Sequence, residues 1–151
     1  MTEEGNHGPG VWIRIQHRFH TRMTEWQLAV VTFLWGLMLL HPASTFDQPD
    51  FSGFKEIFKS ETLLGAGMVF LGVLRIGGLI VNGARQNVTP HIRVLSAGVG
   101  CMIFAGITWF YMLSEIWSPW LAVYPVFVVS EFINVFRAAH DVGESRNGQT
   151  T

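Results

Sequence analysis

Charged residues are scarce in this chain of 151 residues, at 14% of the total against 49% hydrophobic residues. An ordinary soluble domain carries roughly 25% charged residues. The formal net charge is -1, so there is no strongly basic field to attract nucleic acid. The length fits a single domain. The shortage of charged residues therefore favours a membrane protein over a soluble one.

Cysteine occurs only once, which excludes an internal disulfide and any chemistry that needs two thiols. Cys101 lies among Val, Met, Ile and Phe, and we interpret it as a small packing residue. The first ten residues are polar and glycine-rich rather than apolar. We therefore expect no cleaved signal peptide, and we expect the first span to act as its own insertion signal.

Catalytic motifs are lacking too, so we predict a protein that is not an enzyme and uses no cofactor or metal. None of the six histidines lies inside an apolar run, so convergent haem or metal ligands are not expected. Gly65-Ala66-Gly67 lies inside an apolar run. It therefore lacks the strand–turn–helix setting of a phosphate-binding loop.

Four continuous apolar runs predict an all-α integral membrane protein with four transmembrane helices in a bundle. The predicted spans cover about residues 26–40, 62–82, 94–113 and 120–136. A bilayer core about 30 Å thick needs around 20 helical residues. The first and last spans are shorter, so they must draw in flanking residues or thin the bilayer. The resulting organisation is a tail over 1–25, a membrane domain over 26–136 and a tail over 137–151.

Basic residues in the loops predict the orientation. One side carries Arg14, Arg18, Arg22, Arg85, Arg93, Arg137 and Arg146. The other side carries only Lys55 and Lys59. By the positive-inside rule both termini face the cytoplasm, which agrees with an even number of spans.

Two flanking segments have the spacing of amphipathic helices. Residues 11–23 predict a basic interfacial helix that lies on an anionic leaflet, with an ordinary charged flank as the alternative. Its membrane-surface residues are Trp12, Arg14, Ile15, Arg18, Phe19 and Arg22. Residues 50–59 place Phe51, Phe54 and Phe58 at the same spacing. They predict a second helix that rests on the outer surface, or a plain loop.

Arg75 and Glu131 are the charges inside the predicted spans. Arg75 lies seven residues before Asn82 and Glu131 six before Arg137. Both are therefore about 10 Å from the inner boundary, at 1.5 Å per helical residue. Equal depth allows an ion pair, which is either a polar path or a static contact that fixes the packing, unless Arg75 snorkels inward. Asn82 and Asn134 either extend a polar strip or bond across helices.

Small residues predict helix faces that pack closely or self-associate. They are Gly65 and Gly72 in the second span, and Ala97, Cys101 and Ala105 in the third.

Three stretches carry a resemblance: Trp26 to Val30, Thr89 to Arg93, and Tyr124 to Val126. With its size and layout, the chain resembles small multi-span membrane proteins of bacteriophages that infect Gram-negative bacteria. Holins are common among them; a holin oligomerises in the inner membrane and permeabilises it. The tail from Arg137 to Arg146 is less charged than in many holins.

The resemblance thus implies a holin-like function in the bacterial inner membrane, with the lipid bilayer and further copies of the chain as partners. Two alternatives stay open. The chain is an accessory subunit that binds a larger membrane partner, or it is a small channel or transporter that uses Arg75 and Glu131.

The topology is tested by reporter fusions. We expect Met1 and Thr151 to face the cytoplasm, and residues near Asp47 and Trp117 to face outward, because of the bias in basic residues. Alkaline phosphatase should be active when fused near Asp47 or Trp117 and inactive when fused at the C-terminus. An active C-terminal fusion would show that the span count or the orientation is wrong.

Overall fold

The computed structural model describes residues 22–84 and 90–147, and every regular element in those residues is helical. In chain order the elements are α2 (Met23–Leu39), η1 (Pro49–Phe51), α3 (Ser52–Ile57), α4 (Glu61–Ala84), α5 (Pro90–Leu113), η2 (Pro119–Ala122) and α6 (Tyr124–Asn147). The predicted all-α class is confirmed.

Proline sets several of the helix ends. α2 ends two residues before His41-Pro42, since a residue that precedes proline disfavours the helical conformation. α5 begins at Pro90, because the first turn of a helix does not need the missing N–H group. Pro119 opens the short turn η2, from which the chain enters α6. Because α6 continues to Asn147, the predicted tail over 137–151 is helical as far as that residue.

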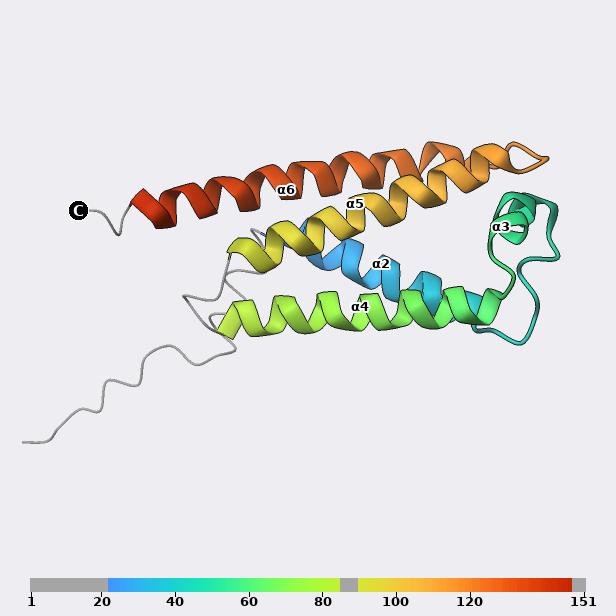
Figure 1. Ribbon diagram of the computed structural model, residues 1–151, viewed down its shortest axis with the longest axis horizontal. Helices are drawn as coiled ribbons and strands as arrows, with labels where there is room; N and C mark the ends of the chain where they lie inside the picture. Colours follow the sequence, from blue (N-terminus) through green and yellow to red (C-terminus); the bar gives the residue numbers. More distant parts are fainter. Residues whose placement is uncertain (1–21, 85–89, 148–151) are drawn as a thin grey trace, which may run out of the picture.

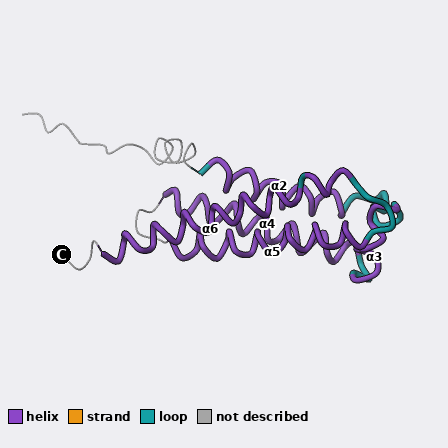
Figure 2. The backbone as a smooth tube through the Cα atoms, turned by 90° about the horizontal axis from the view of Figure 1, so that it is seen from above, coloured by secondary structure: helices purple, strands orange, loops and turns teal. Residues whose placement is uncertain are grey.

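The four long helices form two antiparallel hairpins that lie side by side (Figure 1). α2 packs along α4 in the first hairpin, and α5 packs along α6 in the second. Contacts between the two hairpins are fewer than contacts within them. The view from above in Figure 2 shows α3 across one end of the bundle. We call this the outer end, and the opposite end, where α2 and α5 begin, the inner end.

Glycines let the two helices of the first hairpin approach closely. A Cβ atom at Gly36 on α2 would lie 2.5 Å from the backbone nitrogen of Val69 and 2.8 Å from the carbonyl oxygen of Gly65 on α4. A Cβ atom at Gly72 would lie 2.6 Å from the Cα atom of Phe33. Small residues permit such backbone contact between membrane helices. Gly65 and Gly72 thus lie on the α2–α4 seam.

Large apolar side chains cover the outside of the bundle. Leu63, Phe70, Leu95, Met102 and Phe136 are all exposed. Three helical segments are long and apolar enough to cross a membrane: Glu61–Val81, His91–Leu113 and Trp120–Gly143. α2, with 17 residues, is about 25 Å long at 1.5 Å per residue. These features suit a bundle surrounded by lipid.

The segment over residues 50–59 is helical in part, but its aromatic face turns into the bundle. Phe54 is fully buried, with ring centroids 5.0 Å from Tyr111 and 5.7 Å from Trp35. Phe51 and Phe58 pack against the same core. The expectation that these rings rest on the outer membrane surface was therefore wrong, because the wide outer end of the bundle offers them a larger apolar contact.

Charged residues in α3 and in the loop ahead of it remain outside the core. Lys55 Nζ lies 3.0 Å from Asp47 Oδ1, and both side chains are exposed. The hydrogen bond from Lys55 lowers the pKa of the Asp47 carboxyl group. This pair is a surface contact against which a buried ion pair can be compared.

The α2–α4 seam is tested by two matched glycine substitutions. Gly36→Ala should destabilise the bundle by about 1–3 kcal/mol, because the added methyl group meets α4 backbone. Gly67→Ala should be neutral or stabilising, because a Cβ atom there has open space and alanine favours helix. Thermal unfolding in detergent measures both. Equal effects of the two substitutions would contradict the close approach at Gly36.

Candidate functional site

Arg75 of α4 and Glu131 of α6 form an ion pair inside the bundle, through Arg75 Nη2 and Glu131 Oε1. Arg75 is 6% exposed and Glu131 is fully buried. Arg75 Nη1 donates to Thr32 Oγ1 of α2 at 3.2 Å, and Asn134 Nδ2 donates to Glu131 Oε2 at 3.3 Å. These four residues, from three helices, are the central cluster.

Gly100 brings α5 against the central cluster. A Cβ atom at Gly100 would lie 2.5 Å from Arg75 Nη1 and 2.6 Å from Glu131 Cδ. Any larger residue would therefore displace the pair. The buried residues of α5 recur every three or four positions, as Arg93, Ala97, Gly100, Phe104, Ile107 and Tyr111. This spacing of a bundle helix aims both Gly100 and Arg93 at the interior.

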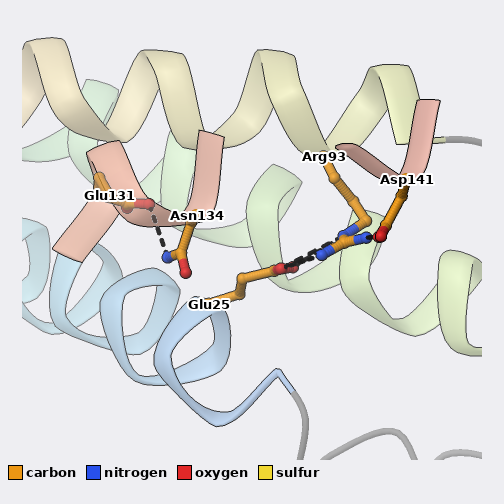
Figure 3. A network of polar contacts seen from close by, with 5 residues as sticks. All are labelled: Glu25, Arg93, Glu131, Asn134 and Asp141. Atoms are coloured by element: carbon orange, nitrogen blue, oxygen red, sulfur yellow. Dashed lines mark hydrogen bonds and ion pairs between the residues drawn. The ribbon is translucent and has the colours of Figure 1, made fainter. Parts of the chain in front are cut away.

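A second group of charges lies nearer the inner end, and we call it the inner cluster. Arg93 Nη2 lies 2.6 Å from Glu25 Oε1 of α2, and Arg93 Nη1 pairs with Asp141 of α6. Arg93 and Glu25 are each 9% exposed, whereas the Asp141 side chain is 47% exposed. Figure 3 shows the three residues joined between their helices, with Glu131 and Asn134 deeper in the bundle.

A small cavity lies between the two clusters. Its volume is about 40 Å³. Glu25, Arg75, Arg93, Ser96 and Glu131 line it together with the apolar residues Leu74, Leu79, Ile92 and Ala97, of which Leu74 and Ile92 also reach the outside of the bundle. Glu25 precedes Thr32 by seven residues, as Arg93 precedes Gly100. The clusters are therefore about 10 Å apart along the bundle, at 1.5 Å per helical residue.

Aromatic side chains close the outer half of the interior. Phe104 and Phe54 are fully buried, and Phe104 lies against Phe127 with ring centroids 5.3 Å apart. Tyr111 stacks on Tyr124 at 5.5 Å. These rings, which we call the aromatic layer, separate the central cluster from the outer end. The buried charged side chains thus lie toward the inner side of the bundle, among apolar residues such as Leu28 and Leu79, whereas the outer side is filled mainly by aromatic rings.

The two clusters balance most of their own charge. Two guanidinium groups face three carboxylates, of which Asp141 is the most exposed. An unpaired buried charge costs several kcal/mol, so a bundle that places Arg75 and Glu131 at this depth requires them to pair. The pairs connect the first hairpin to the second and fix how the hairpins face each other.

Most of the other residues singled out by the sequence are described. Ala97 is buried and lines the cavity. Cys101 is partly buried, with its Sγ atom 3.9 Å from the carbonyl oxygen of Val128 on α6. Ala105 is exposed, because a step of four residues moves around the helix by about 40° each time. Asn82 lies near the end of α4, and its side chain is outside the described part.

The predicted interfacial helix over residues 11–23 falls almost wholly outside the described residues. Trp12, Arg14, Ile15, Arg18 and Phe19 belong to that segment. Arg22 is described and directly precedes α2. Surface binding by this segment stays a prediction.

Sequence reasoning did not find the inner cluster. Arg93 was counted only as a loop charge that orients the chain, and Glu25 was placed in the tail ahead of the first span. The available signal was the seven-residue spacing from Glu25 to Thr32 and from Arg93 to Gly100. Such spacing puts residues on one helix face. No group of three metal-ligating side chains gathers in the described residues.

Comparison with protein-family models, curated proteins and solved structures finds no match to this chain.

The central ion pair is tested by a double-mutant cycle. Arg75→Gln and Glu131→Gln should each destabilise the bundle by about 3–5 kcal/mol, because each leaves the other charge buried without its partner. The double variant should regain much of the loss, because two neutral amides can hydrogen-bond. Thermal unfolding in detergent gives the coupling energy.

The matched control for that cycle is the exposed pair. Lys55→Gln combined with Asp47→Asn should show no coupling, because water screens both groups. Strictly additive effects at Arg75 and Glu131 would contradict the buried pair.

Proposed function

We propose that this chain is a small membrane channel or transporter whose path runs between the two hairpins and includes Arg75 and Glu131. One observation carries this proposal: all four long helices contribute charged or polar side chains to the bundle interior. A bundle does not need these charges for stability, since apolar residues of similar volume often serve as well. Ionisable residues inside a membrane commonly mark ion and substrate paths.

The proposed topology has four spans with both termini on the cytoplasmic side of a bacterial inner membrane. α2 is short, but it follows α4 through the bundle. α2 packs mainly on α4, with Gly36 against Gly65 near the outer end and Phe33 against Gly72 farther in, and its inner end reaches α5 through Glu25 and Arg93. If α4 crosses the bilayer, a helix packed along it over this distance crosses as well, by local thinning of the bilayer.

The position of the aromatic layer supports a gated path. The central cluster lies beside the cavity on its inner side, whereas Phe104 and the stacked Tyr111 and Tyr124 lie on its outer side. Passage to the outer side therefore requires these rings to move. The fewer contacts between hairpins favour a relative motion of the two hairpins as the opening step.

Holin-like permeabilisation is the second candidate, and the hairpin arrangement favours it over an accessory role. If hairpins from several copies separated and reassembled, the faces that carry Arg75, Glu131 and Arg93 would line a wide aqueous lesion. Such faces would bring charged groups to the wall of the lesion, although most of their other buried residues are apolar. The two candidates differ in the size of what passes.

Flux through liposomes that contain the purified chain tests the proposal. We expect small ions, protons included, to pass while a trapped organic dye is retained, because the path lies inside a single bundle. Glu131→Gln should abolish the flux by removing the central carboxylate. Glu115→Gln is the matched control, because it changes the same residue type at an exposed position outside the helices and should conduct normally.

Each other outcome selects a rival. Release of the dye would favour a holin-like lesion. Liposomes that stay tight to ions and dye would overturn the proposal and favour an accessory subunit.

A further inference from the structure

The cavity between the clusters lies beside a polar atom whose hydrogen bond is missing. Arg75 Nε is buried and has no partner within the part of the chain that the structure describes, although both terminal nitrogens of the same guanidinium are bonded. A buried donor without a partner costs about 1–3 kcal/mol. The side chain is more than nine-tenths buried and lines the cavity. The geometry therefore calls for an acceptor inside the cavity.

We propose that this cavity is an internal water site that carries protons between Glu131 and the inner cluster, so that the proton is the species moved. The inference deepens the proposed function and rests on it for the complete crossing. The waters form a short chain. At one end a water accepts the hydrogen bond of Arg75 Nε, and at the other end the chain reaches the hydroxyl group of Ser96 and the carboxylate of Glu25.

The size and charge of the cavity favour water over a dissolved ion. A volume of about 40 Å³ has room for roughly three waters. The charged lining consists of two guanidinium groups, from Arg75 and Arg93, and two carboxylates, from Glu25 and Glu131. These charges cancel, so neither a metal cation nor an anion gains a net attraction. A proton needs only a chain of hydrogen bonds and an acceptor.

The separation of the two clusters along the bundle suits such a chain. The clusters lie about 10 Å apart, and about three hydrogen bonds of about 2.8 Å each cover most of that distance. A protonated water beside Glu25 passes one proton along the chain to Glu131. The carboxylate becomes a neutral acid, and a neutral water remains at the inner end.

Protonation of Glu131 breaks its ion pair with Arg75 and leaves that guanidinium without its carboxylate, so the neutral acid is a high-energy state that holds the proton only in transit. Arg75 keeps its charge and its bond to Thr32, and gains an acceptor at Nε from the water. Asn134 bonds the other carboxylate oxygen from the same helix. Arg93 stays paired with Glu25, so no second cation approaches Glu131. The proton therefore binds to Glu131 at a site where Arg75 is the only permanent cation.

Two adjacent glycines provide a matched test. Gly78 lines the cavity, and a Cβ atom there meets only Ile92 at 3.8 Å, so Gly78→Leu should fold and fill the cavity. A Cβ atom at Gly77 has nothing within 4 Å, so Gly77→Leu changes the same residue type outside the cavity. In liposomes with a trapped pH-sensitive dye and an imposed potential, the wild type and Gly77→Leu should carry protons. Gly78→Leu should fall to the level of protein-free liposomes.

Hydration is measured separately by solid-state NMR transfer from water to side chains in lipid bilayers. Ala97 lines the cavity and should receive magnetisation from water. Ile107, which is equally buried nearer the aromatic layer, should not. In Gly78→Leu the signal at Ala97 should disappear.

The outcomes separate the two proposals. If Ala97 is as dry as Ile107, or if Gly78→Leu conducts protons like Gly77→Leu, the water site is wrong. If the wild type carries other small ions but no protons, the proposed function stands and this inference fails. If a hydrated wild type carries nothing, the proposed function fails and the proton role fails with it.

Discussion

Arg75 lies on a helix whose other buried neighbours are small or apolar, and its charge near a helix centre in hydrocarbon costs about 2.5–3.5 kcal/mol on insertion scales. Glu131 offsets that cost, but only if α6 of the second hairpin faces α4 of the first. Thr32 and Gly100 then have to lie at the same depth, one to accept a hydrogen bond and the other to leave room. The ion pair thus sets the register of all four long helices.

Polar and apolar interactions divide the interior between them. Glycines on the α2–α4 seam bring the backbones of these two helices into contact. Aromatic rings fill the outer end of the bundle beneath α3. Neither device joins the two hairpins in the inner half, where the charged clusters do so instead. An interface that contains ion pairs beside a small cavity is easier to hydrate than an entirely apolar one, and this property links the architecture to the proposed conduction.

The sequence predicted the helical class and the neighbourhood of Arg75 and Glu131, because apolar run length and helical rise act locally. It misplaced the rings of residues 50–59, because an amphipathic pattern does not reveal whether its apolar face meets lipid or protein. It missed Glu25 and Arg93, since charges at the ends of apolar runs look like solvated flanks until the helices are assembled. The role of Gly100, which leaves room for the Arg75–Glu131 pair, appears only once the helices are assembled.

The most direct test of this account measures the contact between Arg75 and Glu131 in a bilayer. Solid-state NMR on protein labelled with ¹⁵N in arginine and ¹³C in glutamate detects nitrogen and carboxyl carbon atoms that lie close together, as they do in an ion pair. We predict a contact signal from an ionised carboxylate that disappears in Glu131→Gln while the Arg93–Glu25 signal persists. A spectrum that Glu131→Gln leaves unchanged would contradict the ion pair on which the arrangement of the helices depends.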